Sequence, residues 1–227
     1  MEVPENSKET LEDTAVWQKV SAVVNETLEE MLSQLSPEKA GPIREIFDFR
    51  RSISSESDRG AVLMAAAFLD DKLKYLLSAK LVDDKKLARR AFDFNGPLGT
   101  FSSRIDFAYL IGVLPKNVHS DLHTIRGIRN KFAHNAASLT LEDQEITELC
   151  NRLIFHGVRE VAAPGPKFRR SVMALLTFVV TATSEISHLE PAADYPVPDR
   201  KDAYKEISQV WSSMTDRPYP IRDQHEE

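Results

Sequence analysis

The segment from Val118 to Asn135 constrains the fold more than any other stretch of the chain. It reads VHSDLHTIRGIRNKFAHN, and its apolar residues recur every three or four positions, as on one face of an α-helix. At about 100° per residue these side chains gather within roughly 80° of one another, a stripe that must face a core. The stripe consists of Val118, Leu122, Ile125, Ile128 and Phe132. A helix of this kind predicts a helical bundle.

A second row on the same segment is polar. Arg126, Asn130 and His134 lie four residues apart and therefore share one helix face. Arg129 falls at the edge of the apolar stripe, where its stem can pack while its guanidinium reaches outward. The row is either a site that contacts RNA or nucleotides, or an ordinary helix end. In the second interpretation His134 complements the helix dipole and Asn135 adopts the left-handed cap conformation.

Helical spacing also dominates the rest of the chain, and no stretch shows the alternation of a strand. We expect helices at about 14–35, 61–81, 85–92, 102–114, 141–155 and 168–189. Gly41-Pro42 is expected to end a short helix that starts after Ser36. One amphipathic turn is expected at 203–211. The predicted fold class is therefore all-α.

This pattern predicts an antiparallel helical bundle with additions at both ends. Residues 1–53 are expected to form an N-terminal helical extension, and residues 54–189 the bundle domain. Residues 190–227 hold many prolines and are expected to form a C-terminal tail that is extended or partly ordered.

Composition narrows the functional classes. The net charge of −6 argues against a domain that binds duplex DNA, because such domains carry a surface rich in Lys and Arg that contacts the phosphates. The polar N-terminus does not resemble a signal peptide, and the longest apolar run, 172–180, is too short to cross a bilayer. The single cysteine, Cys150, excludes an internal disulfide, and its apolar neighbours indicate a core residue rather than a nucleophile. We expect a cytoplasmic protein without membrane contact.

Three separated blocks resemble the mannitol operon repressor family. They are DRGAVLMAAAFLDDKLKYLL at 58–77, FNGPLGTFSSRIDFAYLIGVLP at 94–115 and DLHTIRGIRNKFAH at 121–134, and the similarity covers about residues 54–189. The resemblance implies a compact α-helical protein that is associated with transcription regulation but has no recognisable DNA-binding motif. It therefore implies action through a protein partner, with a transcription regulator among the candidates. It does not specify the operon or the signal.

The hexapeptide RNKFAH at 129–134 has the form R-N-x-x-x-H and resembles the hallmark of HEPN domains. These are α-helical bundles that often dimerise and sometimes act as metal-independent ribonucleases. In that resemblance Arg129 stabilises the phosphate, His134 handles the proton and Asn130 orients the site. On an ideal helix Arg129 and His134 lie about 140° apart, so a shared site needs a local distortion or a second subunit. An endoribonuclease or nucleotide-binding domain is therefore the alternative function.

Four residues are candidate binding residues: Arg126 of the polar row, and three residues that could rim a pocket beside that row. These three are Arg104, Asn95 and Arg59. Structural roles compete with this interpretation. A buried pair of Arg104 or Arg59 with Asp70 or Asp106 would orient helices instead of binding a ligand.

We expect no metal site and no cofactor. His119 and His123 are four residues apart and could ligate a metal, but no third ligand is evident in the sequence. The leading interpretation is a regulatory protein that is not an enzyme. It would bind a protein partner and form a homodimer, because HEPN-like bundles often pair and the N-terminal extension offers spare apolar surface. RNA would be a partner only under the alternative, and no direct binding of duplex DNA is expected.

Overall fold

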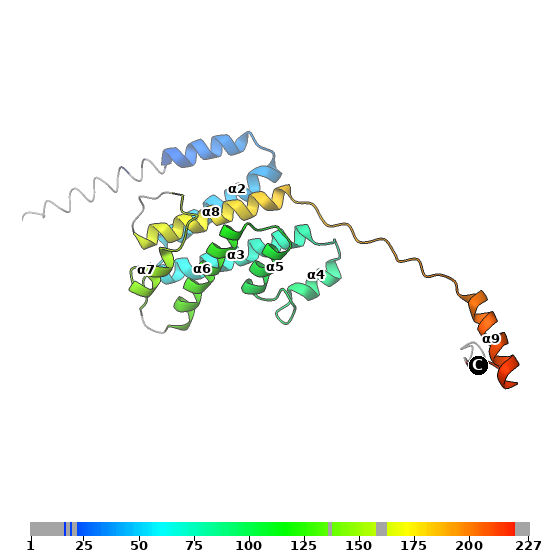
Figure 1. Ribbon diagram of the computed structural model, residues 1–227. Helices are drawn as coiled ribbons and strands as arrows, with labels where there is room; N and C mark the ends of the chain where they lie inside the picture. The colour runs from blue at the N-terminus through cyan, green and yellow to red at the C-terminus, as the bar shows by residue number, and fades with distance from the viewer. Residues whose placement is uncertain (1–15, 17–18, 20–21, 136–137, 158–162, 221–227) are drawn as a thin grey trace, which may run out of the picture. The chain divides into compact units, whose positions relative to one another are not determined.

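The structure is a computed structural model that describes residues 16, 19, 22–135, 138–157 and 163–220. The described part of the chain is all-α, as predicted, with no strand (Figure 1). It divides into two compact units, Met1–Leu189 and Glu190–Glu227. Residues 22–33 are helical, and the helices that follow are α2 (Pro37–Ser55), α3 (Asp58–Lys80), α4 (Lys85–Phe92), α5 (Phe101–Leu110), α6 (Lys116–His134), α7 (Gln144–Cys150), α8 (Pro164–Glu185) and α9 (Lys201–Thr215).

Helix α3 is the centre of the first unit, where it packs against α2, α5, α6 and α8. Figure 1 shows α2 and α8 on one side of the bundle, where α8 packs against α2, α3, α6 and α7. The apolar stripe predicted on α6 faces this core, and its five members are completely buried. They are Val118, Leu122, Ile125, Ile128 and Phe132. Burial of each such side chain stabilises the fold by about 1.5–3 kcal/mol relative to exposure.

The prediction that Gly41-Pro42 ends a helix is wrong, because α2 continues through Pro42. Proline lacks the N–H that would bond to the carbonyl four residues earlier, so α2 loses one hydrogen bond there. Ile46, Phe49 and Ile53 follow on the next turns and are buried. Their burial offsets the lost bond. The boundary suggested after residue 53 falls inside α2.

The predicted left-handed cap at Asn135 is also wrong, because this residue is extended, with φ −95° and ψ 116°. A side chain from α3 binds the end of α6 instead. Arg59 donates to the carbonyl oxygens of Phe132 at 2.6 Å and of Asn135 at 2.8 Å. The cation also lies at the negative end of the helix dipole.

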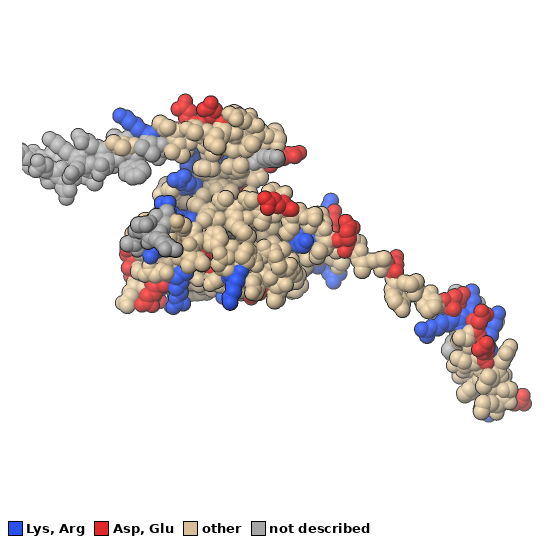
Figure 2. Space-filling view, turned by 45° about the horizontal axis from the view of Figure 1, so that its top comes forward, with Lys and Arg blue, Asp and Glu red and all other residues tan. Residues whose placement is uncertain are grey.

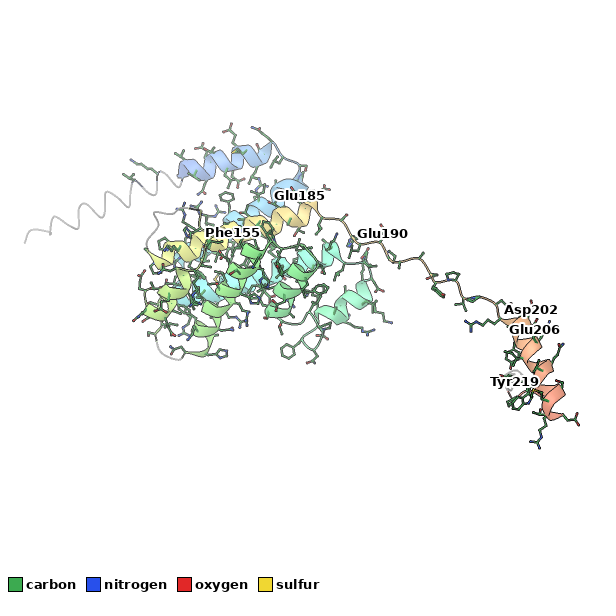
Figure 3. All side chains as sticks on the ribbon, in the orientation of Figure 1. Phe155, Glu185, Glu190, Asp202, Glu206 and Tyr219 are labelled. Atoms are coloured by element: carbon green, nitrogen blue, oxygen red, sulfur yellow. The ribbon has the colours of Figure 1, made fainter. Side chains whose placement is uncertain are left out.

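Helix α7 is shorter than the helix predicted at 141–155, and a carboxylate of α6 explains its earlier end. Asp121 is 1% exposed and accepts hydrogen bonds from the backbone N–H groups of Ile154 at 3.0 Å and Phe155 at 2.9 Å. These N–H groups are therefore not available to a longer helix. Burial raises the pKa of Asp121, and the two N–H donors partly oppose that rise. Phe155 lies beside α8, with its ring 6.3 Å from that of Phe178 (Figure 3).

The second unit contains α9, which extends beyond the turn predicted at 203–211. Figure 3 shows Tyr219 folded back beside α9. Its ring lies 5.6 Å from Tyr204 and 5.8 Å from Trp211, so a small aromatic cluster stabilises the longer helix. Across the described residues of both units, every helix is too short or too polar to span a bilayer.

Candidate functional site

Arg129 and the polar row of α6 line two different pockets. Arg129 lines a shallow pocket of about 490 Å³ together with Arg104 and Asp70. Asn130 and His134 line a separate pocket. Arg129 also donates to the side-chain oxygen of Asn130 at 3.0 Å. Helix α6 is regular along its length, so Arg129 and His134 do not meet in one pocket of the described chain, and their catalytic roles stay predictions.

Arg104 joins α5 to α3 and to the loop before α5. Its Nη1 lies 2.6 Å from Oδ1 of Asp70, and its Nε donates to the carbonyl oxygen of Leu98 at 2.8 Å. This is one of the Arg-to-carboxylate pairs considered from the sequence. Burial raises the pKa of Asp70, while the charges of Arg104 and Arg129 act to lower it. The Arg104 guanidinium is thus engaged in holding the fold, which leaves it little capacity for a ligand.

The other candidate binding residues lie in different environments. Arg59 binds the end of α6, whereas Asn95 is exposed in the loop between α4 and α5. Arg126 is half-buried, and its Nε is enclosed without a hydrogen-bond acceptor among the described residues. The structure therefore does not gather these residues with Arg104 around one pocket, and their binding roles stay predictions.

Cys150 is completely buried at the end of α7, which confirms the prediction of a core residue. Burial raises the pKa of its thiol to about 12, and the charge of Glu142 adds to that rise. The thiol is therefore protonated at neutral pH and is not a nucleophile.

Helix α4 and the loop after it expose cationic and apolar side chains together. Leu87 on α4 is exposed, and Phe94 in the loop is 82% exposed. Within the described part of the chain, none of the four cationic residues of α4 forms an ion pair. These four are Lys85, Lys86, Arg89 and Arg90. We refer to them, together with Leu87 and Phe94, as the α4 surface.

The loop that carries Phe94 has a narrowly defined backbone. A Cβ atom on Gly96 would lie 2.3 Å from the carbonyl oxygen of Arg90, and one on Gly99 would lie 2.4 Å from that of Asp93. Only glycine allows approaches this close. The Phe94 N–H donates to the carboxylate of Asp93 at 2.8 Å. The exposed ring is therefore presented on a constrained backbone.

Two histidines of α6 converge on a carboxylate of α5. Nε2 of His119 donates to Oδ1 of Asp106 at 2.9 Å, and Nε2 of His123 donates to the same oxygen at 2.8 Å. The hydrogen bonds from His119 and His123 lower the pKa of Asp106. The sequence indicated the histidine pair, but Asp106 was considered only as a partner of Arg104 or Arg59, because only the turn between α5 and α6 brings that carboxylate to the histidines. We refer to these residues as the Asp106–His119–His123 cluster.

Comparison with known proteins does not assign the chain to a family. No protein-family model matches the sequence, and no curated protein matches it. The structure is similar to a chain of the X-ray structure of the MtlR–HPr complex from Escherichia coli, with a TM-score of 0.45 and 18% sequence identity. The match covers 62% of this chain and 99% of that chain. This similarity concerns the arrangement of the helices alone.

Proposed function

We propose that this chain is a transcription-regulatory protein of the mannitol operon repressor type, and that it acts by binding a protein partner through the α4 surface. The observation that carries this proposal is the exposure of Phe94 on a constrained loop beside four cationic side chains. The three sequence blocks that resemble the repressor family support the regulatory role.

An exposed aromatic ring on a constrained backbone, beside a cluster of cations, is suited to contact a partner. Aromatic residues are enriched in the cores of protein interfaces, where a few of them supply most of the binding energy. Because the backbone around Phe94 is already constrained, little conformational entropy would be lost on binding. The cations of α4 would attract an acidic partner and raise the rate of association.

The distribution of charge favours a protein over duplex DNA as this partner. On the face shown in Figure 2, cationic and anionic side chains are interspersed and do not form a continuous basic stripe. The net charge of the chain is −6. A duplex would meet repulsion over much of such a surface, because its affinity depends on many phosphate contacts with Lys and Arg.

HPr is a defined first probe, because it is the protein named with MtlR in the similar structure. Calorimetric titration of the full chain with purified HPr should show saturable binding. Phe94→Ala should weaken this binding by about tenfold or more, as expected for a central aromatic contact. Arg89→Ala should chiefly slow association and reduce its dependence on salt.

Tyr195 supplies the matched control, because it is as exposed as Phe94 but belongs to the second unit. Tyr195→Ala should bind HPr like the wild type. If Phe94→Ala bound HPr as tightly as the wild type, the α4 surface would not be the binding site. If the wild type did not bind HPr, HPr would not be the partner. Tight binding of operator DNA with a steep salt dependence would contradict action through a protein partner.

Ribonuclease activity of the HEPN type is the second candidate, favoured by one contact. Arg129 and Asn130, two of the three motif residues, touch each other on α6, and Asn130 shares a pocket with His134. Cleavage of RNA in the presence of EDTA, abolished by Arg129→Ala and by His134→Ala, would establish this activity. Cleavage that both variants retain would assign it to a contaminant or to another site.

A further inference from the structure

We propose that Asp106, His119 and His123 form a binding site for a divalent transition-metal ion of the zinc class. One ligand atom from each of the three residues lies within 4.8 Å of the other two. The histidines are four residues apart on α6 and thus share one face, and α5 supplies the carboxylate opposite them. This inference does not depend on the α4 surface or on its partner.

The ligand types select the metal. Two imidazole nitrogens with one carboxylate suit Zn²⁺, Co²⁺, Ni²⁺ or Fe²⁺, whereas Mg²⁺ and Ca²⁺ prefer oxygen ligands throughout. Zinc sites with two histidines and one carboxylate keep at least one further position for water or another ligand. The cluster offers that access, since the Asp106 side chain is about half exposed and those of both histidines about one-quarter exposed. A bound ion would therefore retain an exchangeable position facing solvent.

The side chains already lie close to the arrangement that a metal requires. Ligand atoms of a tetrahedral zinc site are separated by about 3.3 Å, given metal–ligand bonds of about 2.0–2.1 Å. The Asp106 oxygen is 2.9 Å from Nε2 of His119 and 2.8 Å from Nε2 of His123, so it needs to withdraw by only a few tenths of an ångström. The Nε2 atoms of His119 and His123, which lie within 4.8 Å of each other, would also have to reach a separation of about 3.3 Å through rotation of the two imidazole rings. The ring of Tyr109, 4.7 Å from that of His119, limits the rotation of this histidine.

The same nitrogens that would bind the metal donate to Asp106 in the metal-free protein. A metal ion would bind each Nε2 lone pair in the tautomer that carries the ring proton on Nδ1, so each imidazole would keep its proton and the two hydrogen bonds to Asp106 would be replaced by metal–ligand bonds. The competing explanation is that the cluster only links α5 to α6 through hydrogen bonds. The two explanations differ in a measurable way, because hydrogen bonds alone give no selective affinity for zinc.

The test is a calorimetric titration of ZnCl₂ into the full-length chain, freed of any histidine tag and dialysed against EDTA and then against buffer. The wild type should bind one Zn²⁺ per chain. His119→Ala, His123→Ala and Asp106→Asn should each lose about tenfold or more in affinity, because each removes or weakens one ligand. Co²⁺ bound to the wild type should show the visible absorption of a low-coordinate site, and His123→Ala should lose that absorption.

His134→Ala is the matched control, because His134 lies on the same helix but outside the cluster. It should bind zinc like the wild type. Circular dichroism of every variant should match the wild type, so that loss of binding is separated from loss of folding. Absence of zinc binding by the wild type would overturn the proposal. Equal affinity in the His119→Ala, His123→Ala double variant would overturn it as well.

Discussion

Two charged clusters join α5 to its neighbours, and they differ in burial and in how their donors are engaged. The Arg104–Asp70 pair has side chains that are 10% and 27% exposed, and Arg104 also donates to the Leu98 carbonyl. In the Asp106–His119–His123 cluster the carboxylate is 52% exposed, and two histidines share one of its oxygens.

The difference separates a structural role from a candidate binding role. A buried guanidinium with a carboxylate and a carbonyl as acceptors has little capacity for a ligand, and removing it leaves desolvated groups behind. An exposed cluster stabilises the fold little, because solvent screens its charges and competes for its hydrogen bonds. The meeting of Asp106, His119 and His123 at one point is therefore better explained by binding of a metal ion than by a contribution to stability.

The largest expected effect is at Asp121, and it tests how much a buried carboxylate contributes to the free energy of unfolding. Asp121→Ala removes a buried carboxylate and leaves the partly buried N–H groups of Ile154 and Phe155 without their acceptor. Each such group costs about 1–3 kcal/mol, so the free energy of unfolding should fall by about 3 kcal/mol. Urea denaturation followed by circular dichroism measures this change. Asp121→Asn keeps an acceptor oxygen, and it should lose clearly less; equal losses would contradict this assignment.

The pH dependence of Asp121 follows from its raised pKa. Since burial favours the protonated carboxyl in the folded state, the stabilisation from this group is fully present below the unfolded-state pKa. It is lost as the pH rises through the folded-state pKa. Asp121→Asn cannot ionise, so its stability relative to the wild type should improve between pH 4 and pH 7. A constant difference over this range would contradict the raised pKa.

Removal of the guanidinium tests the buried cluster directly. Arg104→Met leaves Asp70 without its cation and frees the Leu98 carbonyl. Breaking a fully buried pair costs about 3–5 kcal/mol, and the partial exposure of Asp70 reduces the expected loss to about 2 kcal/mol. Lys131→Met, which breaks the exposed pair with Glu145, should change stability by about 0.5 kcal/mol or less. Similar losses in the two variants would remove the contrast between buried and exposed pairs.

A smaller effect is expected at the exposed cluster. Without metal, Asp106→Asn should change the free energy of unfolding by about 0.5 kcal/mol or less, because solvent screens the interactions of Asp106 with the two histidines. Thermal melts of the wild type and of Asp106→Asn, with and without ZnCl₂, test whether the cluster binds metal. Zinc should raise the melting temperature of the wild type, since it binds the folded state, and should leave that of the variant nearly unchanged. A loss of stability as large as that of Arg104→Met would indicate a structural role for the cluster.

The smallest effect on stability is expected at Phe94. Because its ring is exposed, Phe94→Ala should change the free energy of unfolding by about 0.5 kcal/mol or less. Phe101, in the same sequence block, is buried, and Phe101→Ala should lose about 3 kcal/mol. Urea denaturation of the two variants measures this contrast. A large loss at Phe94 would show that its ring is needed for folding and would weaken its assignment as a contact residue.

Much of the fold could be predicted because local patterns determine it. The apolar stripe of α6 follows directly from helical spacing, and the predicted range 85–92 coincides with α4. The site was harder to predict. His119 and His123 share a helix face by spacing alone, whereas Asp106 reaches them only through the packing of α5 on α6.

The sequence by itself determined the helical class, the buried face of α6 and the polar row beside it, since these follow from residue type and period. Tertiary structure decided where helices end and which polar groups meet. Asp121 takes the N–H groups that would have extended α7, and Arg59 replaces the expected cap at Asn135. These outcomes depend on contacts between residues far apart in the chain. Local propensity cannot specify them, because a buried polar group bonds to whichever partner the packing brings within reach.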